Sequence, residues 1–515
     1  MTTSTRRAFL GGVGSSMLAV GLGSPLGARG ALALALPGRR LDKLDFGPLE
    51  PLAALMQETP PGKLQRILIQ KIRQGTELRT LVSAGALANA RSFGGHDYTG
   101  YHCQMALMPA WEMSRQLPGE QRALPVLKVL YRNAARIQEK GGRGREALQA
   151  LPEPAAATRE ESVARLRRAY LDRDVARAEG AFAELSRGGA AEAYADLQGI
   201  LRENLDVHRV VLAWRAWEVL QLTGEEHART LLRQSVRFCI DAEESRLRHG
   251  RPEPVLRALL PELLERHGLA GGEPEPRTVS DEEIEELSLV VLCCPRAEAA
   301  EAVARALASG MSLHDAGEAL TVAANQLLLH DPGRQRNATP EKPLGSVHGA
   351  SVGVHASDAA RAWRNIAAVS SRGDAVASLI AGAYHTAGQT EHVGEKPFPY
   401  AECYGDVQKE SAETMLEQLR AAVEAGDQKL ASAVADCYGE LGCPPRPLFQ
   451  LLLEYALSED GALHAEKYYR TACEDFDGGR AAFRWRHAIA LARVTASQYG
   501  HPAPGYAEAR ELLAV

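Results

Sequence analysis

The chain has 515 residues, of which 24% are charged, with a formal net charge of −6 and a pI near 6.2. This balance offers no broad positive surface to a phosphate backbone, so we expect no nucleic-acid partner. The length exceeds what one small hydrophobic core usually holds and predicts several packed regions.

The N-terminus carries the most specific pattern, Thr5-Arg6-Arg7-Ala8-Phe9-Leu10. An uncharged stretch rich in Gly and Ser follows over residues 8–28, and small residues recur up to Ala35. This order resembles a cleavable twin-arginine signal, the type that the Tat export machinery recognises. The resemblance implies that residues 1–35 are removed and that the mature protein is periplasmic or otherwise exported. The alternative is an apolar N-terminus with a chance arginine pair.

No stable membrane span is predicted. The apolar stretch of the signal is interrupted by several glycines and by Pro25. No other segment approaches the roughly 18 uninterrupted apolar residues that a spanning helix requires.

Helical periodicity dominates the rest of the chain. Residues 191–222 place apolar side chains and His208 close to a 3.6-residue repeat, which predicts one long helix with a buried stripe. Ser280 with Glu283, and Ser312 with Asp315, are typical of helix starts. Further short amphipathic helices are predicted over residues 413–424, 428–441, 447–457 and 479–499. The predicted fold class is all-α, as stacked helical hairpins or an α/α toroid whose Gly-rich loops carry the site.

Gly- and Pro-rich stretches suggest how the mature chain is divided. They cover residues 141–159, 269–280 and 397–400. We expect an N-terminal helical region over residues 36–270, a histidine-rich helical region over 281–398, and C-terminal helical hairpins over 399–515. Six of the fifteen histidines lie between His314 and His392.

The first candidate site is the segment Gly94-Gly95-His96-Asp97-Tyr98-Thr99-Gly100-Tyr101-His102. Its glycines permit a tight turn, and a loop is needed to bring His96 over the first helical turn beside His102. We predict both histidines as metal ligands and Asp97, Tyr98 and Tyr101 as catalytic groups, since a carboxylate can orient a ligand histidine. The alternative is that Asp97 or Thr99 caps a helix whose first turn packs His102.

The second candidate site lies within residues 344–358, where His348 and His355 are seven apart. Two helical turns separate them by about 10 Å, so one ion can take both only if the chain bends at Gly349 or Gly353. Ser357 is then predicted to cap the following helix. The alternative is a Gly-rich surface loop that contains two histidines.

Flanking segments add His330, His385 and Tyr384, the tyrosine as a further catalytic candidate. His208 is a separate case, because a histidine on a buried stripe is either a ligand or a hydrogen-bonded core residue. The full predicted ligand set is His96, His102, His208, His330, His348, His355 and His385. No HExxH, paired ExxH, GxSxG or phosphate-loop motif accompanies it.

Three functions remain open at this point. The first is an exported metal-dependent enzyme, an oxidoreductase acting on a small-molecule substrate, with a histidine-ligated transition metal. Iron is favoured, because a chain that folds before export can take up a weakly binding metal in the cytoplasm. The second is a metal-free lyase or hydrolase with His and Tyr as acid and base. The third is a helical-repeat binding protein.

Overall fold

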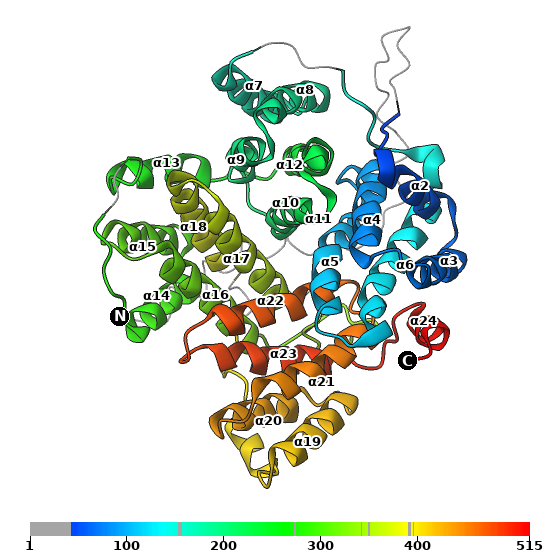
Figure 1. The fold of residues 1–515 in the computed structure, drawn as a ribbon. Helices are drawn as coiled ribbons and strands as arrows, with labels where there is room; N and C mark the ends of the chain where they lie inside the picture. The colour runs from blue at the N-terminus through cyan, green and yellow to red at the C-terminus, as the bar shows by residue number, and fades with distance from the viewer. Residues whose placement is uncertain are drawn as a thin grey trace. The chain divides into compact units, whose positions relative to one another are not determined.

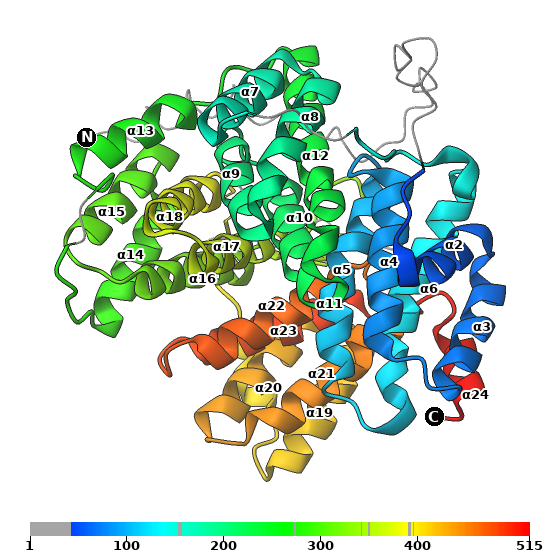
Figure 2. The same cartoon turned by 45° about the horizontal axis from the view of Figure 1, so that its top comes forward.

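The computed structural model describes residues 43–152, 157–271, 274–340, 342–348, 351–389, 393–394 and 396–515. The predicted export signal lies outside the described residues. Between Lys43 and Val515 the chain forms one compact unit. The described residues contain 23 α-helices and no β-strand, which confirms the all-α fold class (Figures 1 and 2).

The helices follow one another in three groups. The N-terminal group is α2 (Glu50–Glu58), α3 (Pro61–Arg73), α4 (Leu78–Phe93), α5 (Tyr98–Ser114), α6 (Leu124–Glu139), α7 (Arg159–Asp172), α8 (Val175–Leu185), α9 (Ala190–Leu201), α10 (Val207–Glu218), α11 (Leu220–Thr223), α12 (Ala228–Arg248) and α13 (Leu256–Arg266). The middle group is α14 (Asp281–Cys293), α15 (Arg296–Ala308), α16 (Leu313–Leu329), α17 (Val352–Val369) and α18 (Arg372–Ala387). The C-terminal group is α19 (Ala412–Glu424), α20 (Gln428–Glu440), α21 (Pro445–Ser458), α22 (His464–Gly478), α23 (Arg484–Gln498) and α24 (Tyr506–Leu513).

Two predicted helix starts are confirmed by their capping bonds. Ser280 and Glu283 form a reciprocal capping box at α14, which satisfies two of the unpaired N–H groups of its first turn. At α16 the hydroxyl of Ser312 accepts a hydrogen bond from the backbone N–H of Asp315, at 3.0 Å.

The single helix predicted over residues 191–222 is wrong, because the segment forms α9, α10 and α11. Asp206 interrupts it: its Oδ1 accepts from the backbone N–H of His208 at 2.9 Å and of Arg209 at 3.2 Å. A carboxylate that bonds the next backbone N–H groups starts a new helix. His208 therefore lies in the first turn of α10 and not in the middle of a long buried stripe.

The predicted capping role of Ser357 is also wrong. The helix starts six residues earlier, where Ser351 accepts from the N–H of Val354, and the hydroxyl of Ser357 bonds the Gly353 carbonyl inside α17. Gly353 lies against α16, where an added Cβ would come within 2.7 Å of the Cα of Leu328. The glycine thus permits a close crossing of two helices and does not bend the chain.

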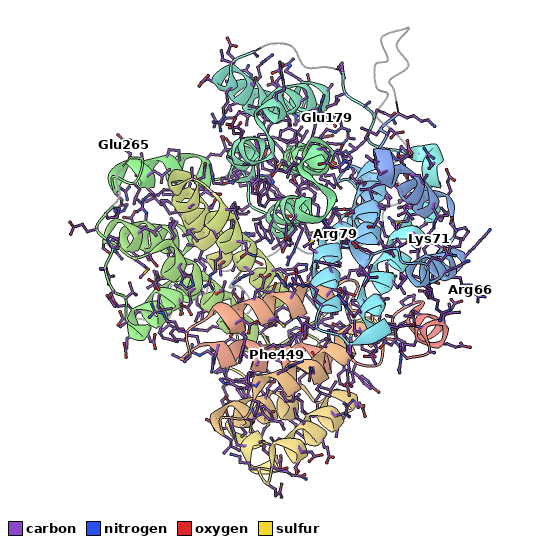
Figure 3. All side chains as sticks on the ribbon, viewed as in Figure 1. Arg66, Lys71, Arg79, Glu179, Glu265 and Phe449 are labelled. Carbon is purple, nitrogen blue, oxygen red and sulfur yellow. The ribbon has the colours of Figure 1, made fainter. Side chains whose placement is uncertain are left out.

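Helices from all three predicted regions pack against each other. Helix α5 contacts α10 and α22, and α17 contacts α10 and α22, so that these four helices form a ring. Both ribbon views show them next to one another (Figures 1 and 2). Charged side chains such as Arg66 and Glu265 are exposed (Figure 3). The predicted regions therefore combine around one centre.

No helix among the described residues is long and apolar enough to cross a membrane.

Candidate metal centre

Four histidines meet where α5, α10, α17 and α22 come together. They are His102, His208, His355 and His464, and we call them the four-histidine cluster. Their ring centroids lie 4.8 Å apart between His102 and His208, 5.2 Å between His208 and His355, and 4.9 Å for the two pairs that His464 forms with His355 and His102. Each lies within the first five residues of its helix. The cluster is carried by first helical turns and not by the Gly-rich loops that precede two of them.

Three members place their ring nitrogens close enough to share one ion. One nitrogen each of His102, His355 and His464 lies within 4.8 Å of the others. The Nε2 atoms of His355 and His464 are 3.1 Å apart. Two nitrogens bound to one ion at 2.0–2.1 Å lie about 2.8 to 3.4 Å apart for angles between 90° and 109°. The observed separation fits two ligands of one metal.

Hydrogen bonds to the backbone fix the tautomers of these rings. In His102, His355 and His464 the Nδ1 atom faces a backbone carbonyl oxygen. The Nδ1 to oxygen distances are 2.7 Å for His102 and Tyr98, 3.0 Å for His355 and Ser351, and 3.1 Å for His464 and Ala462. A carbonyl oxygen only accepts, so each Nδ1 carries the proton and donates. In a neutral imidazole the Nε2 atom then offers a lone pair, as a metal requires.

Two of the Nε2 atoms are buried without a partner. Neither Nε2 of His102 nor Nε2 of His208 has a hydrogen-bond partner among the described residues. The Nδ1 atom of His208 lies 3.5 Å from the carboxylate of Asp206, which orients its Nε2 away from that group. A buried polar atom without a partner costs free energy, and a bound cation would satisfy both.

The surroundings favour neutral rings. Burial lowers the pKa of His102, His355 and His464 well below the usual value, and the positive charge of Lys467 acts in the same direction. The converging N-terminal helix ends add partial positive charge that further disfavours imidazolium. Protonation therefore does not relieve the repulsion between the lone pairs on Nε2 of His355 and Nε2 of His464, which face each other at 3.1 Å.

Tyr98 and Tyr101 lie against the histidines. The ring of Tyr98 is 4.3 Å from that of His102 and 5.7 Å from that of His208, and the ring of Tyr101 is 5.1 Å and 5.4 Å from the same two. Burial raises the pKa of both phenols, so both keep their protons at neutral pH. The rings of these two predicted catalytic groups therefore pack directly against the cluster.

Two side chains beside the cluster reach solvent. Tyr98 is 45% exposed, and the side chain of Asp206 is 49% exposed. Burial acts to raise the pKa of Asp206, but its interaction with His208 and the N–H of Arg209 hold that pKa well below the usual range.

Polar pairs extend from the cluster between α17 and α22. One turn beyond His355 and His464, the carboxylate of Asp358 lies 3.9 Å from the ammonium of Lys467 and accepts from Thr471 at 3.0 Å. Both charged side chains are almost completely buried. The pairs align the two helices in register and so align their histidines.

The remaining residues of the first candidate site bond elsewhere. His96 pairs with Asp241 and accepts from Arg237 at 2.8 Å. Asp97 accepts from the N–H of Gly100 at 2.8 Å, which makes it the N-cap of α5, and it forms two bonds with Arg136 at 2.6 and 2.7 Å. The capping role left open for Asp97 is the one observed, and the structure does not bring His96 to the cluster.

Three predicted ligands and one predicted catalytic group also lie apart from the cluster. His348 contacts the hydroxyl of Ser497 at 2.9 Å, and the Nδ1 atom of His385 accepts from the indole of Trp363 at 3.2 Å. Tyr384 stacks under the guanidinium of Arg296, whose carbon is 5.7 Å from the ring centre. His392 lies outside the described residues.

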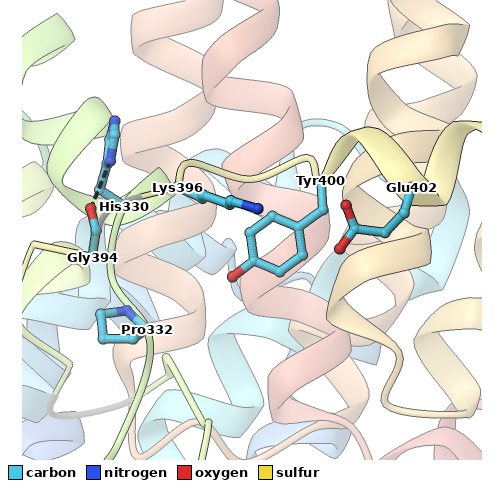
Figure 4. A pocket seen from close by; sticks show the side chains of 6 residues that line it. All are labelled: His330, Pro332, Gly394, Lys396, Tyr400 and Glu402. Carbon is cyan, nitrogen blue, oxygen red and sulfur yellow. Dashed lines mark hydrogen bonds between the residues drawn. The ribbon is translucent and has the colours of Figure 1, made fainter.

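His330 lines a different cavity. Its Nδ1 donates to the Gly394 carbonyl at 3.1 Å, and the cavity of about 180 Å³ beside it is also lined by Lys396, Tyr400 and Glu402 (Figure 4). Three of its polar lining groups come from the segment after α18, and none is a second histidine.

A second group of potential ligands, His314, Asp315 and Glu318, is already paired with arginines. Arg480 contacts Asp315 at 2.6 Å and Glu318 at 3.2 Å, and Arg364 lies 3.0 Å from the Nε2 atom of His314. Guanidinium groups occupy the positions that a cation would take, so this group is an ion-pair network.

His464 is the functional residue that sequence reasoning missed. It lies far from the histidine-rich region and follows a turn at Gly461 and Ala462. One signal was present: His464, Lys467, Thr471 and Asp475 recur at helical spacing, and all four are buried. A polar stripe on a buried helix face indicates a functional or ion-paired interior.

Comparison with known proteins adds no assignment, because no family model, no curated protein and no solved structure matches this chain.

Proposed function

We propose that this protein binds one transition-metal ion through Nε2 of His102, His355 and His464, with His208 as a fourth ligand, and that it is a metal-dependent enzyme. The observation that carries the proposal is the convergence of Nε2 lone pairs whose Nδ1 atoms are committed to backbone carbonyls. Such a pattern is unfavourable without a cation and favourable with one.

The donor set narrows the choice of metal. Imidazole ligands suit iron, copper, zinc and nickel, whereas magnesium and calcium require oxygen ligands. We favour iron, since a chain exported after folding would acquire its metal in the cytoplasm, where tighter-binding copper and zinc are scarce. The twin-arginine export route remains part of the proposal.

Oxidoreductase chemistry is the activity we propose. Four histidine ligands would still leave coordination positions for a substrate on an octahedral ion, and a redox-active metal supplies electron transfer when bound. Tyr98 and Tyr101 stay protonated beside His102, so that they can donate a proton or hydrogen bond to a bound substrate. Tyr98 is also partly exposed, so one side of it can meet a small molecule from solvent.

Metal analysis tests the proposal. We expect protein purified from its native compartment without a polyhistidine tag to contain about one metal per chain. The triple variant His102→Ala, His355→Ala, His464→Ala should contain none, while His96→Ala with His348→Ala should retain the metal. Metal-free wild type that remains active would instead support the acid–base lyase or hydrolase, and metal retained by the triple variant would place the ion elsewhere.

A further inference from the structure

We infer that the metal centre takes a small anionic ligand, a carboxylate or an inorganic monoanion, whose charge is paired by the buried ammonium of Lys467. This inference rests on the proposed function, because it concerns a ligand of the same ion. It names the chemical class of substrate that the proposed metal centre would take.

The position of Lys467 is the first support. Lys467 is 1% exposed and lies three residues after His464, on the same face of α22. Its ammonium donates no hydrogen bond to any described residue, and Asp358 approaches only to 3.9 Å. A buried ammonium normally makes close charge-assisted hydrogen bonds, so its donors are available to a ligand.

Lys467 also lies close to the ligand atoms. It lies about one helical turn after His464 in α22, and its neighbour Asp358, 3.9 Å away, lies about one turn after His355 in α17. A group bound to the ion on that side would therefore lie between the metal and the ammonium.

The charge balance is the second support. Four histidines that bind through Nε2 add no charge to a divalent ion. Lys467 adds one positive charge, and Asp358, 3.9 Å away, adds one negative charge. Asp206 contributes one negative charge beside His208. One positive charge then remains in an enclosed site, and one bound monoanion neutralises it.

The first turn of α22 is the third support. The N–H of His464 donates to the Gly461 carbonyl at 2.9 Å, but the N-cap residue, Leu463, provides no side-chain acceptor for the N–H groups that follow in the first turn. Exposed N–H groups at the N-terminus of a helix bind anions. Their partial positive charge adds to the charge of the Lys467 ammonium.

Azide and imidazole, one anionic and one neutral metal ligand, test the inference on the full-length protein loaded with cobalt(II). Visible absorption of the cobalt reports both the stoichiometry of the metal and the binding of each probe. We expect Lys467→Met to raise the Kd for azide at least about tenfold, and Asp358→Asn to lower it several-fold, because the local charge changes in opposite directions. The Kd for imidazole should change by less than about twofold in both variants.

The outcomes separate the two proposals. Wild type that takes up no cobalt at the four-histidine cluster contradicts the proposed function itself. Cobalt bound normally with an azide Kd unchanged by Lys467→Met contradicts only the anion inference, as does a parallel change for azide and imidazole. If Lys467→Met does not fold, two other variants test the inference. Lys467→Arg keeps the positive charge and should keep the azide Kd within about threefold of wild type. Asp358→Asn should bind azide more tightly than wild type, and an unchanged or higher Kd in that variant overturns the inference.

Discussion

The Nε2 atoms of His355 and His464 lie 3.1 Å apart, although each ring already donates its proton through Nδ1 to a backbone carbonyl. Two lone pairs facing each other at this distance repel. Because burial and Lys467 also oppose protonation of either ring, a metal ion between them is the arrangement that resolves the contact.

Single ligand variants should lower metal affinity to different degrees. We expect His355→Ala and His464→Ala to lose more affinity than the roughly 10–100-fold typical of outer-shell partners, since each removes a direct bond to the ion. His208→Ala should lose less, because His208 lies outside the tightest group of three. Competition titration with a coloured chelator measures the affinities. Equal affinity for His348→Ala and His355→Ala would contradict the assignment.

Asp206 should stabilise α10 through its cap. Asp206→Ala removes the acceptor for two first-turn N–H groups and should lower the free energy of unfolding by about 1 kcal/mol. Asp206→Asn should retain most of that stability, because an asparagine oxygen also caps a helix. Urea unfolding at neutral pH compares the two variants, and a larger loss for the asparagine than for the alanine would argue against a capping role.

Gly353 should be required for the packing of α17 against α16. In Gly353→Ala the new methyl group would clash with the backbone of Leu328, and overpacking of this kind costs about 1–3 kcal/mol. The clash should also displace His355, two residues away, and weaken metal binding. Gly180→Ala is the matched control: Gly180 lies inside α8 with no atom within 4 Å of an added Cβ, so it should gain up to about 1 kcal/mol. Thermal unfolding together with chelator titration decides between these outcomes.

His385 should make the protein less stable in acid. Burial lowers its pKa to about 4, whereas in the unfolded chain it titrates near 6.5. The unfolded state therefore binds a proton first as the pH falls, and stability declines between pH 6.5 and 4 by about 3 kcal/mol for this group. His385→Asn keeps an acceptor for the Trp363 indole and should remove that part of the decline. Urea unfolding of the metal-free protein at pH 7 and pH 4.5 measures it, and an identical decline in the variant would show that other groups are responsible.

The fold class and several helix starts could be predicted from local sequence. Capping by Ser280 and Ser312 depends on residues three positions apart, and such pairs are visible in the chain. The break at Asp206 was missed because the apolar repeat continues across it. The carboxylate of Asp206 accepts hydrogen bonds from backbone N–H groups, and the spacing of apolar residues carries no information about such bonds.

The candidate site could be predicted only in part. His102, His208 and His355 were among the expected ligands, and the structure brings these three rings together. The histidine-rich stretch did not form the site as a unit, because His330, His348 and His385 satisfy local partners instead. His464 joins His355 across 109 positions, a contact that depends on how α17 packs against α22 and that no local spacing reveals.

Anomalous diffraction from crystals of the natively loaded protein, produced without a polyhistidine tag, tests the central claim most directly. We predict one strong metal peak per chain, about 2.0–2.2 Å from Nε2 of His102, His355 and His464. A chain that contains no metal after native purification, or a peak at His314, Asp315 and Glu318 instead, would contradict it.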